Sequence, residues 1–201
     1  MRATLLLIRL HEVGLSFESA SGWQVYDPSG RRKYLNADER RRFLAAADKE
    51  PASVRALCYF LVYCGCRVSE ALHLERDQID NVDGGVILRT LKRRRIVFRR
   101  VPLPHDIVAA LLEIAPSAGR VWRVHRVTAW RWTARVMDEA GIAGPMACCR
   151  GTRHGFAIHD ATKRVPPNLL QKWMGHASIE TPAIYLDAVG MEERNFAERM
   201  W

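Results

Sequence analysis

The spacing of apolar side chains predicts a helix near the start of the regular part of the chain. Phe43 and Ala47 fall on one face of a segment that begins at Asn36 or Asp38, either of which can cap a helix, and that extends through Asp48. The same helical period recurs further along the sequence. It predicts helices over Val54–Cys64, Val68–Leu74, Asp106–Ala115, Val127–Ala140, Gly155–Lys163, Asn168–Met174 and Glu192–Met200.

The pattern changes from helical to strand-like between residues 79 and 101. Three short segments rich in β-branched residues, Ile79–Val82, Val86–Leu88 and Ile96–Val101, are separated by Asp83-Gly84-Gly85 and by the basic run Lys92–Arg95. They predict a small three-stranded antiparallel sheet whose last hairpin has a basic tip. Together with the helices, the sheet predicts a mainly helical α+β domain.

Residues 1–33 differ from the rest of the chain. A short apolar start leads into polar and glycine residues, and then into the turn cluster Asp27-Pro28-Ser29-Gly30. We treat this segment as an N-terminal appendage without an assigned role. Residues 34–201 form the predicted domain.

Charge narrows the choice of partner. The chain has 201 residues, with 31 Lys and Arg against 22 Asp and Glu, and a formal net charge of +9. Between Val86 and Arg135 stand 12 Lys and Arg but only 2 Asp and Glu, so the other residues together are close to neutral. A basic stretch on structured segments is typical of a surface that follows nucleic-acid phosphates. A solvated charged face is the alternative, and the interleaved Val, Ile, Phe and Trp disfavour it.

Composition excludes several other classes of protein. A hydrophobic content of 48% rules out wholesale disorder. No apolar run approaches the roughly 20 residues of a membrane span, and Leu5–Ile8 is too short for a signal peptide. The five cysteines are odd in number and mostly flanked by apolar residues, which indicates a reduced, cytoplasmic protein. Their spacing suits no zinc site, and nucleotide-binding and metalloprotease motifs are absent, so we expect neither a metal nor a cofactor.

Three separated segments carry the candidate chemistry. They are Gly65-Cys66-Arg67-Val68-Ser69-Glu70, Arg150-Gly151-Thr152-Arg153-His154, and Met174-Gly175-His176 with Tyr185 nine residues after the histidine. In this order and spacing they closely resemble the catalytic-domain signature of the tyrosine recombinases, also called the phage integrase family. The resemblance covers residues 34 to 185 and includes a basic hairpin before Val101-Pro102-Leu103.

The resemblance implies a site-specific recombinase or integrase that cleaves and rejoins DNA strands. Arg67 and Arg153 would hold one phosphate, a task that suits permanently charged, fork-shaped guanidiniums at helix starts. Tyr185 would attack the phosphorus and form a covalent 3′-phosphotyrosine link, which conserves the phosphodiester energy and needs no cofactor. His176 would hydrogen-bond the phosphate, and Lys92 would protonate the leaving 5′-oxygen.

Two positions depart from the family pattern. Arg150 stands where the family most often has His and sometimes Lys, and an arginine cannot act as a base. It can add a third positive contact, which leaves proton removal to water or to another group. Lys92 lies ten residues before Pro102, slightly further than expected, so Arg94 and Arg95 remain alternatives for the acid. We prefer Lys92 because arginine is a poor acid.

Other residues receive less specific predictions. We expect Glu70 to be a structural partner at a helix start, His154 and His159 to be packed core histidines, and Trp130 and Trp132 mainly to pack their helix. We expect DNA contacts from the arginines of the basic stretch, namely Arg93, Arg94, Arg95, Arg123, Arg126 and Arg131.

The resemblance implies double-stranded DNA as the partner, and we expect no membrane partner. The family pattern favours a homotetramer on two DNA sites. The last helix could dock on its own core or on a neighbouring protomer. Family members usually carry a further N-terminal DNA-clamping domain of roughly 100 residues, which residues 1–33 cannot supply. We therefore expect that domain to be absent from this sequence, either because the chain is a fragment of a longer recombinase or because it is a naturally short protein with the catalytic domain alone. Two other functions stay open. One is a DNA-binding module that kept the fold and lost turnover, and the other is DNA relaxation of the type IB topoisomerase kind.

Overall fold

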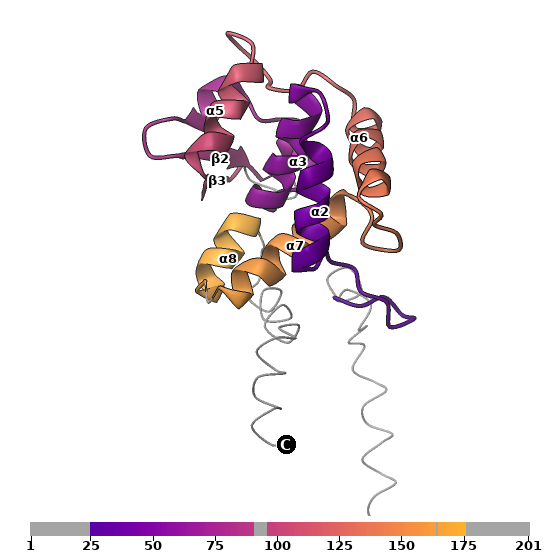
Figure 1. The fold of residues 1–201 in the computed structure, drawn as a ribbon. Coiled ribbons are helices and arrows are strands. Elements are labelled where there is room, and N and C mark those ends of the chain that lie inside the picture. The colour runs from indigo at the N-terminus through magenta and orange to yellow at the C-terminus, as the bar shows by residue number, and fades with distance from the viewer. Residues whose placement is uncertain (1–24, 91–95, 164, 176–201) are drawn as a thin grey trace, which may run out of the picture.

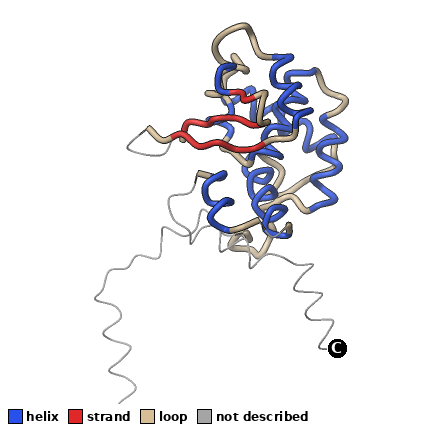
Figure 2. Tube along the Cα trace, turned by 90° about the vertical axis from the view of Figure 1, so that its left-hand side faces the viewer, coloured by secondary structure: helices blue, strands red, loops and turns tan. Residues whose placement is uncertain are grey.

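A computed structural model describes residues 25–90, 96–163 and 165–175 (Figure 1). Helix α3 (Ala52–Cys64) lies at the centre and contacts α2, α5, α6 and α7. The sheet lies to one side of the helices (Figure 2). The predicted class, mainly helical α+β, is confirmed.

The first two described helices begin and end where their sequences favour it. In α2 (Ala37–Ala47), the Asn36 side chain accepts a hydrogen bond from the Glu39 amide, and the Glu39 carboxylate accepts one from the Asn36 amide. Helix α3 ends at Gly65, whose φ of +59° is left-handed and favours glycine. A Cβ at Gly65 would lie 2.2 Å from Cδ1 of Phe156, so packing also requires glycine here.

The predicted three-stranded sheet is confirmed. Helix α4 (Val68–Ala71) and the 3₁₀ turn η2 (Arg76–Gln78) lead into β1 (Ile79–Asp80), β2 (Gly85–Arg89) and β3 (Phe98–Pro102). The strands are antiparallel in the order β1-β2-β3, with Val86 opposite Val101. Alternation along the strands buries Val86, Leu88 and Val101 and exposes Ile87 and Phe98.

The rest of the described chain is helical. It contains α5 (His105–Ile114), α6 (Arg126–Glu139), α7 (Cys149–Thr162) and α8 (Pro167–Met174). Helix α5 packs on α3 and β1, α6 on α2 and α3, and α8 on α7 and β3 (Figure 1). The bounds of α5, α6 and α8 lie within one residue of those predicted. The helix predicted over Glu192–Met200 lies outside the described residues.

Helix α7 begins six residues earlier than predicted, at Cys149 instead of Gly155. Glycine disfavours a helix interior, but a side chain has no room at either glycine of this helix. A Cβ on Gly151 would lie 1.9 Å from the Met146 carbonyl oxygen, and one on Gly155 would lie 3.0 Å from the Leu35 carbonyl oxygen. Close packing therefore overrides propensity.

The largest core cluster joins α3 to the sheet and to α5. Phe60, Leu61 and Leu88 are buried in it. Trp122 packs on Phe60 with ring centroids 5.6 Å apart, and its indole N–H donates to the Ser53 carbonyl over 3.0 Å. Four of the five cysteines are buried thiols, as core packing predicts. No helix in the described ranges is both long enough and apolar enough to cross a membrane.

Residues 27–30 form the predicted turn, in which the Asp27 carboxylate accepts backbone hydrogen bonds from Ser29 and Arg31.

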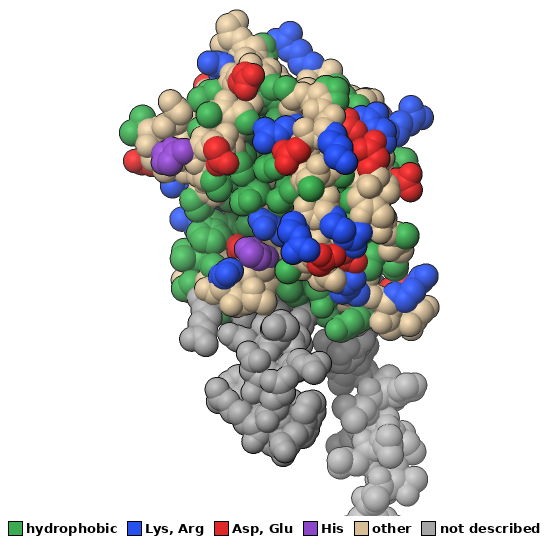
Figure 3. Space-filling model, in the orientation of Figure 1, with side chains coloured by type: hydrophobic (Ala, Val, Ile, Leu, Met, Phe, Trp, Pro, Cys, Tyr) green, Lys and Arg blue, Asp and Glu red, His purple; other side chains and the backbone are tan. Residues whose placement is uncertain are grey.

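The surface of the described residues carries both positive and negative side chains. Across the face seen in Figure 3, Lys and Arg side chains lie among Asp and Glu. The Arg55–Asp48 ion pair at 2.8 Å is one of several such surface pairs.

Candidate functional site

A cleft of about 870 Å³ opens where the start of α4, the start of α6 and the first turns of α7 meet. Its lining includes four arginines and, within the described ranges, no Asp or Glu. The side chains that define it chemically are Arg67, Arg126, Trp130, Arg150, Arg153 and His154. A cleft of this charge attracts anions.

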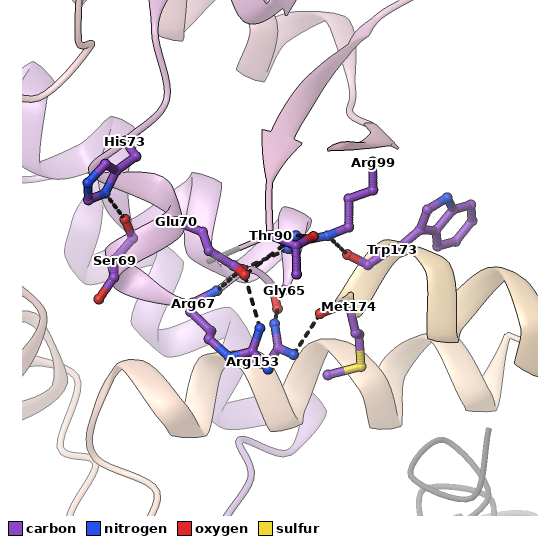
Figure 4. Close-up of polar contacts among 10 residues, drawn as sticks. All are labelled: Gly65, Arg67, Ser69, Glu70, His73, Thr90, Arg99, Arg153, Trp173 and Met174. Carbon is purple, nitrogen blue, oxygen red and sulfur yellow. Dashed lines mark hydrogen bonds and ion pairs between the residues drawn. The ribbon is translucent and has the colours of Figure 1, made fainter. Parts of the chain in front are cut away.

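Arg67 is the N-cap residue of α4, and its side chain is 22% exposed. Its Nη1 donates to Oε1 of Glu70 over 3.0 Å, and its backbone N–H donates to Oε2 of the same carboxylate over 3.0 Å (Figure 4). Glu70 therefore fixes both ends of Arg67 and satisfies an amide at the start of a short helix. The predicted role of Glu70 as a helix-start partner is confirmed.

Glu70 is also paired with a second arginine, from the sheet. Nη2 of Arg99 donates to Oε2 of Glu70 over 2.7 Å, and both side chains are buried. Burial acts to raise the pKa of Glu70, but the charge and hydrogen bonds of Arg99, with those of Arg67, outweigh it and hold the pKa below its usual 4.5. Glu70 is therefore ionised at neutral pH.

Arg153 reaches from α7 to two other helix ends. Its Nη1 donates to the Gly65 carbonyl over 2.6 Å, and its Nη2 donates to the Met174 carbonyl over 2.7 Å (Figure 4). The expectation that Arg153 lies at a helix start is wrong, because it is the fifth residue of α7 and is only 4% exposed. Its guanidinium is held by backbone carbonyls at the ends of α3 and α8, beside the segment that contains Arg67.

Arginines supply positive charge in the cleft, and the buried His154 beside them does not. Arg150, the second residue of α7, is exposed and lines the cleft. His154 is fully buried, as predicted. Burial, followed by the charges of Lys33, Arg153 and Arg150, lowers the pKa of His154 to about 3. Its imidazole therefore stays neutral at physiological pH.

Helix α6 forms one wall of the cleft through Arg126 and Trp130. The prediction that Trp130 mainly packs the helix is wrong, since this side chain is 52% exposed. Trp132 does pack against the core. Arg131 and Arg123 are exposed but do not line the cleft, and Arg123 donates to the Ala118 carbonyl over 3.1 Å.

The remaining predicted site residues lie outside the described residues. These are Lys92, Arg93, Arg94, Arg95, His176 and Tyr185. Helix α8 does end at Gly175, with a left-handed φ of +66°, as the glycine before His176 predicts.

Sequence reasoning missed Arg99. By sequence, Arg99 belongs to the basic stretch between Val86 and Arg135, and a run of charged residues usually lies on a solvent-exposed face. The strand period offers a signal, because Arg99 lies two residues before the buried Val101 and hence on the same face of β3. A charged residue at a buried strand position requires a partner of opposite charge, and Glu70 is that partner.

Three comparisons show which known proteins the chain is similar to. The family model described as the phage integrase family matches residues 33–190. Over 145 residues the chain is 30% identical to tyrosine recombinase XerD of Mycobacterium tuberculosis (strain CDC 1551 / Oshkosh), which covers 65% of this chain and 46% of that protein. Over 177 residues it is 30% identical to tyrosine recombinase XerC of Brucella melitensis biotype 1 (strain ATCC 23456 / CCUG 17765 / NCTC 10094 / 16M), covering 79% of this chain and 55% of that protein.

The fold also matches solved structures. The crystal structure of the XerH site-specific recombinase bound to palindromic difH substrate, a post-cleavage complex, superposes with a TM-score of 0.72 at 20% identity. That match covers 86% of this chain and 60% of that one. The chain thus spans about half the length of the two relatives above.

Proposed function

The chain belongs to the phage integrase family, and on that premise we propose that it cleaves and rejoins DNA strands as a tyrosine recombinase, through a covalent 3′-phosphotyrosine intermediate. The observation that carries the proposal is that Arg67 and Arg153 line the same cleft, whose described lining includes no Asp or Glu. Glu70, which pairs with Arg67, is not part of that lining. Two guanidiniums brought together in this way suit one phosphate diester.

The proposed step begins with the phosphate held in the cleft. Attack on a phosphodiester concentrates negative charge on its non-bridging oxygens, and arginines placed in advance stabilise that charge. Arg67 is oriented by Glu70, and Arg153 is fixed by carbonyl groups at two helix ends. Both guanidiniums are therefore placed before DNA arrives, which reduces the cost of ordering them.

Tyr185 is the proposed nucleophile. Its phenolic oxygen forms a bond to phosphorus while the bond from phosphorus to the 5′-oxygen breaks, and Lys92 gives a proton to that oxygen. His176 is assigned a hydrogen bond to the phosphate. Arg150 lines the cleft and adds a third positive contact. Since an arginine cannot take the phenolic proton, we assign that proton to water.

The partner we propose is double-stranded DNA, bound by a tetramer at two sites. The family match supports it, as does the structural neighbour XerH, which was solved bound to its difH substrate. Arg126 and Trp130, on the wall of the cleft, extend the proposed DNA surface, and Arg93, Arg94, Arg95, Arg123 and Arg131 are assigned to it from the basic stretch. The free thiols fit a reducing cytoplasm.

Trapping of a covalent adduct tests the proposal. Duplexes that the 201-residue chain binds are selected from a randomised pool, then nicked close to each candidate phosphate so that the released strand diffuses away. We expect a protein–DNA adduct that resists detergent. The Tyr185→Phe variant should bind the same duplex and form none. Binding without an adduct on any selected site would instead indicate a DNA-binding module. Plasmid relaxation without recombinant products would indicate a topoisomerase.

A further inference from the structure

Arg99 belongs to the basic stretch by sequence, but its side chain faces the core. It lies on β3 opposite Leu88, and its side chain is 4% exposed. Besides its contact with Glu70, its Nη1 donates to Oγ1 of Thr90 over 2.9 Å, and its Nε donates to the Trp173 carbonyl over 2.8 Å (Figure 4). Among the described residues, Arg99 is not part of the cleft lining.

The charges around Glu70 are unequal. Glu70 orients Arg67 by accepting two hydrogen bonds from it. A carboxylate paired with a single guanidinium cancels most of that guanidinium's field at a nearby anion. Here the same carboxylate also contacts Arg99 at 2.7 Å. The three side chains therefore carry two positive charges and one negative charge, and their sum is +1.

We propose that Arg99 is a positioning residue of the phosphate clamp. It neutralises Glu70 from the buried side, so that Glu70 can orient Arg67 while the cluster keeps a positive charge for the DNA phosphate. The inference rests on the proposed function, because it explains how Arg67 can be both oriented and attractive to an anion. Arg99 itself does not touch the DNA.

Arg99 also has a structural role, which an experiment must separate from its charge. Its bond to Trp173 ties β3 to the last turn of α8. A Cβ at Gly175 would lie 2.9 Å from the Arg99 guanidinium carbon. Loss of Arg99 could therefore weaken the cleft by loosening α8, with no electrostatic effect at all. The two roles differ in one respect. Only the charge role can be restored by removing the negative charge of Glu70.

The experiment titrates the full chain with inorganic phosphate and measures the affinity from the NMR shifts of the backbone amides of residues 67–69. The variants are Arg99→Met, the double variant Glu70→Gln/Arg99→Met, and Arg67→Met as the reference for a lost clamp. The matched control is Arg100→Met. Arg100 is the next residue on β3, its ion pair with Asp80 measures 3.0 Å, and its side chain is 39% exposed.

We expect Arg99→Met to weaken phosphate binding about tenfold, because the charge of the three-residue cluster falls from +1 to 0 while Glu70 still pairs with Arg67. The double variant has Arg67 beside a neutral Gln, so its cluster again carries +1. We expect its affinity to return to within about threefold of the wild type. Arg100→Met should bind phosphate as the wild type does.

Two results would overturn the proposal. One is an Arg99→Met variant that binds phosphate as well as the wild type. The other is a double variant that binds no better than Arg99→Met, which is the result a purely structural role gives.

If the Arg99→Met variant does not fold, the double variant decides between the two roles, because proteins often tolerate a neutral replacement of a buried ion pair. Affinity near the wild type supports the proposal, and affinity as low as that of Arg67→Met overturns it. Phosphate binding needs no strand cleavage, so an absent DNA adduct would overturn the proposed function without deciding the role of Arg99.

Discussion

Arg153 donates a hydrogen bond from Nη1 to the Gly65 carbonyl oxygen over 2.6 Å, and Gly65 lies two residues before Arg67. The two arginines assigned to one phosphate are thus connected through a buried hydrogen bond as well as through the cleft that both line. Helix α7 and the end of α3 cannot separate without breaking it. The geometry of the clamp is therefore coupled to the stability of the core.

This coupling predicts that Arg153→Lys loses stability as well as activity. A lysine ammonium cannot reach the two carbonyls that the guanidinium fork bridges, which leaves a buried carbonyl without its donor. We expect a loss of about 1–3 kcal/mol in the free energy of unfolding, measured with denaturant, together with loss of the covalent adduct. Arg150→Lys is the control for stability, because Arg150 is exposed. An Arg153→Lys protein as stable as the wild type would refute the coupling.

Gly65→Ala should be far more damaging than Gly30→Ala. Both glycines have a left-handed φ, +59° and +74°, so both variants carry backbone strain of about 1–2 kcal/mol. Only at Gly65 would the new Cβ also collide with the Phe156 ring, whereas nothing lies within 4 Å at Gly30. We expect a further loss of about 1–3 kcal/mol at Gly65, the usual cost of overpacking. Equal urea midpoints for the two variants would be inconsistent with this packing.

Asp160 should make the protein less stable as the pH rises. Burial raises the pKa of Asp160 from 3.8 to about 6, although the charge of Arg40 acts to lower it. The folded state thus favours the protonated acid, while the unfolded chain ionises near 3.8. The stability tied to protonation is fully present below pH 3.8 and is lost as the pH rises through 6.

Asp160→Asn removes this titration. We expect the variant to exceed the wild type in stability above pH 6, by at most about 3 kcal/mol, and to match it near pH 3.5. Denaturant unfolding at a series of pH values measures the difference. A difference that does not change with pH would show that Asp160 does not titrate in this way.

Trp130→Ala should lower DNA affinity with little effect on folding. The side chain is 52% exposed and lines the cleft, so its removal should change the free energy of unfolding by less than about 0.5 kcal/mol. Exposed tryptophans at interfaces often contribute more than about 1 kcal/mol to binding, and Trp130→Phe should retain part of that contribution. Binding of the selected duplex measures it. Unchanged affinity of Trp130→Ala would remove this residue from the proposed DNA surface.

Local sequence signals predicted much of this fold. The capping box of Asn36 and Glu39 and the glycine at residue 65 act through nearby backbone, so helix bounds near them follow from the sequence. The start of α7 does not, because it depends on close packing at its two glycines: the Met146 carbonyl lies against Gly151, and the Leu35 carbonyl, from a distant part of the chain, lies against Gly155.

In the candidate site, too, some features follow from the local sequence and others depend on packing between distant segments. The resemblance of the three motifs to the tyrosine recombinases selects Arg67 and Arg153, which the structure brings to one cleft. The burial of Arg99 depends on Glu70, which lies 29 residues away in sequence. The exposure of Trp130 depends on what the neighbouring helices leave uncovered. The strand period places Arg99 on the buried face of β3, but neither its pairing with Glu70 nor the exposure of Trp130 can be read from the local sequence.

The central claim is that Tyr185 attacks a phosphate held by Arg67 and Arg153. The most direct test isolates the adduct formed by the wild-type chain on a nicked, selected duplex, digests it with nuclease and protease, and locates the attached nucleotide by mass spectrometry. The account predicts a nucleotide joined through its 3′-phosphate to the peptide that contains Tyr185, and a free 5′-hydroxyl on the other DNA end. A nucleotide on any other residue, or a link through a 5′-phosphate, would contradict it.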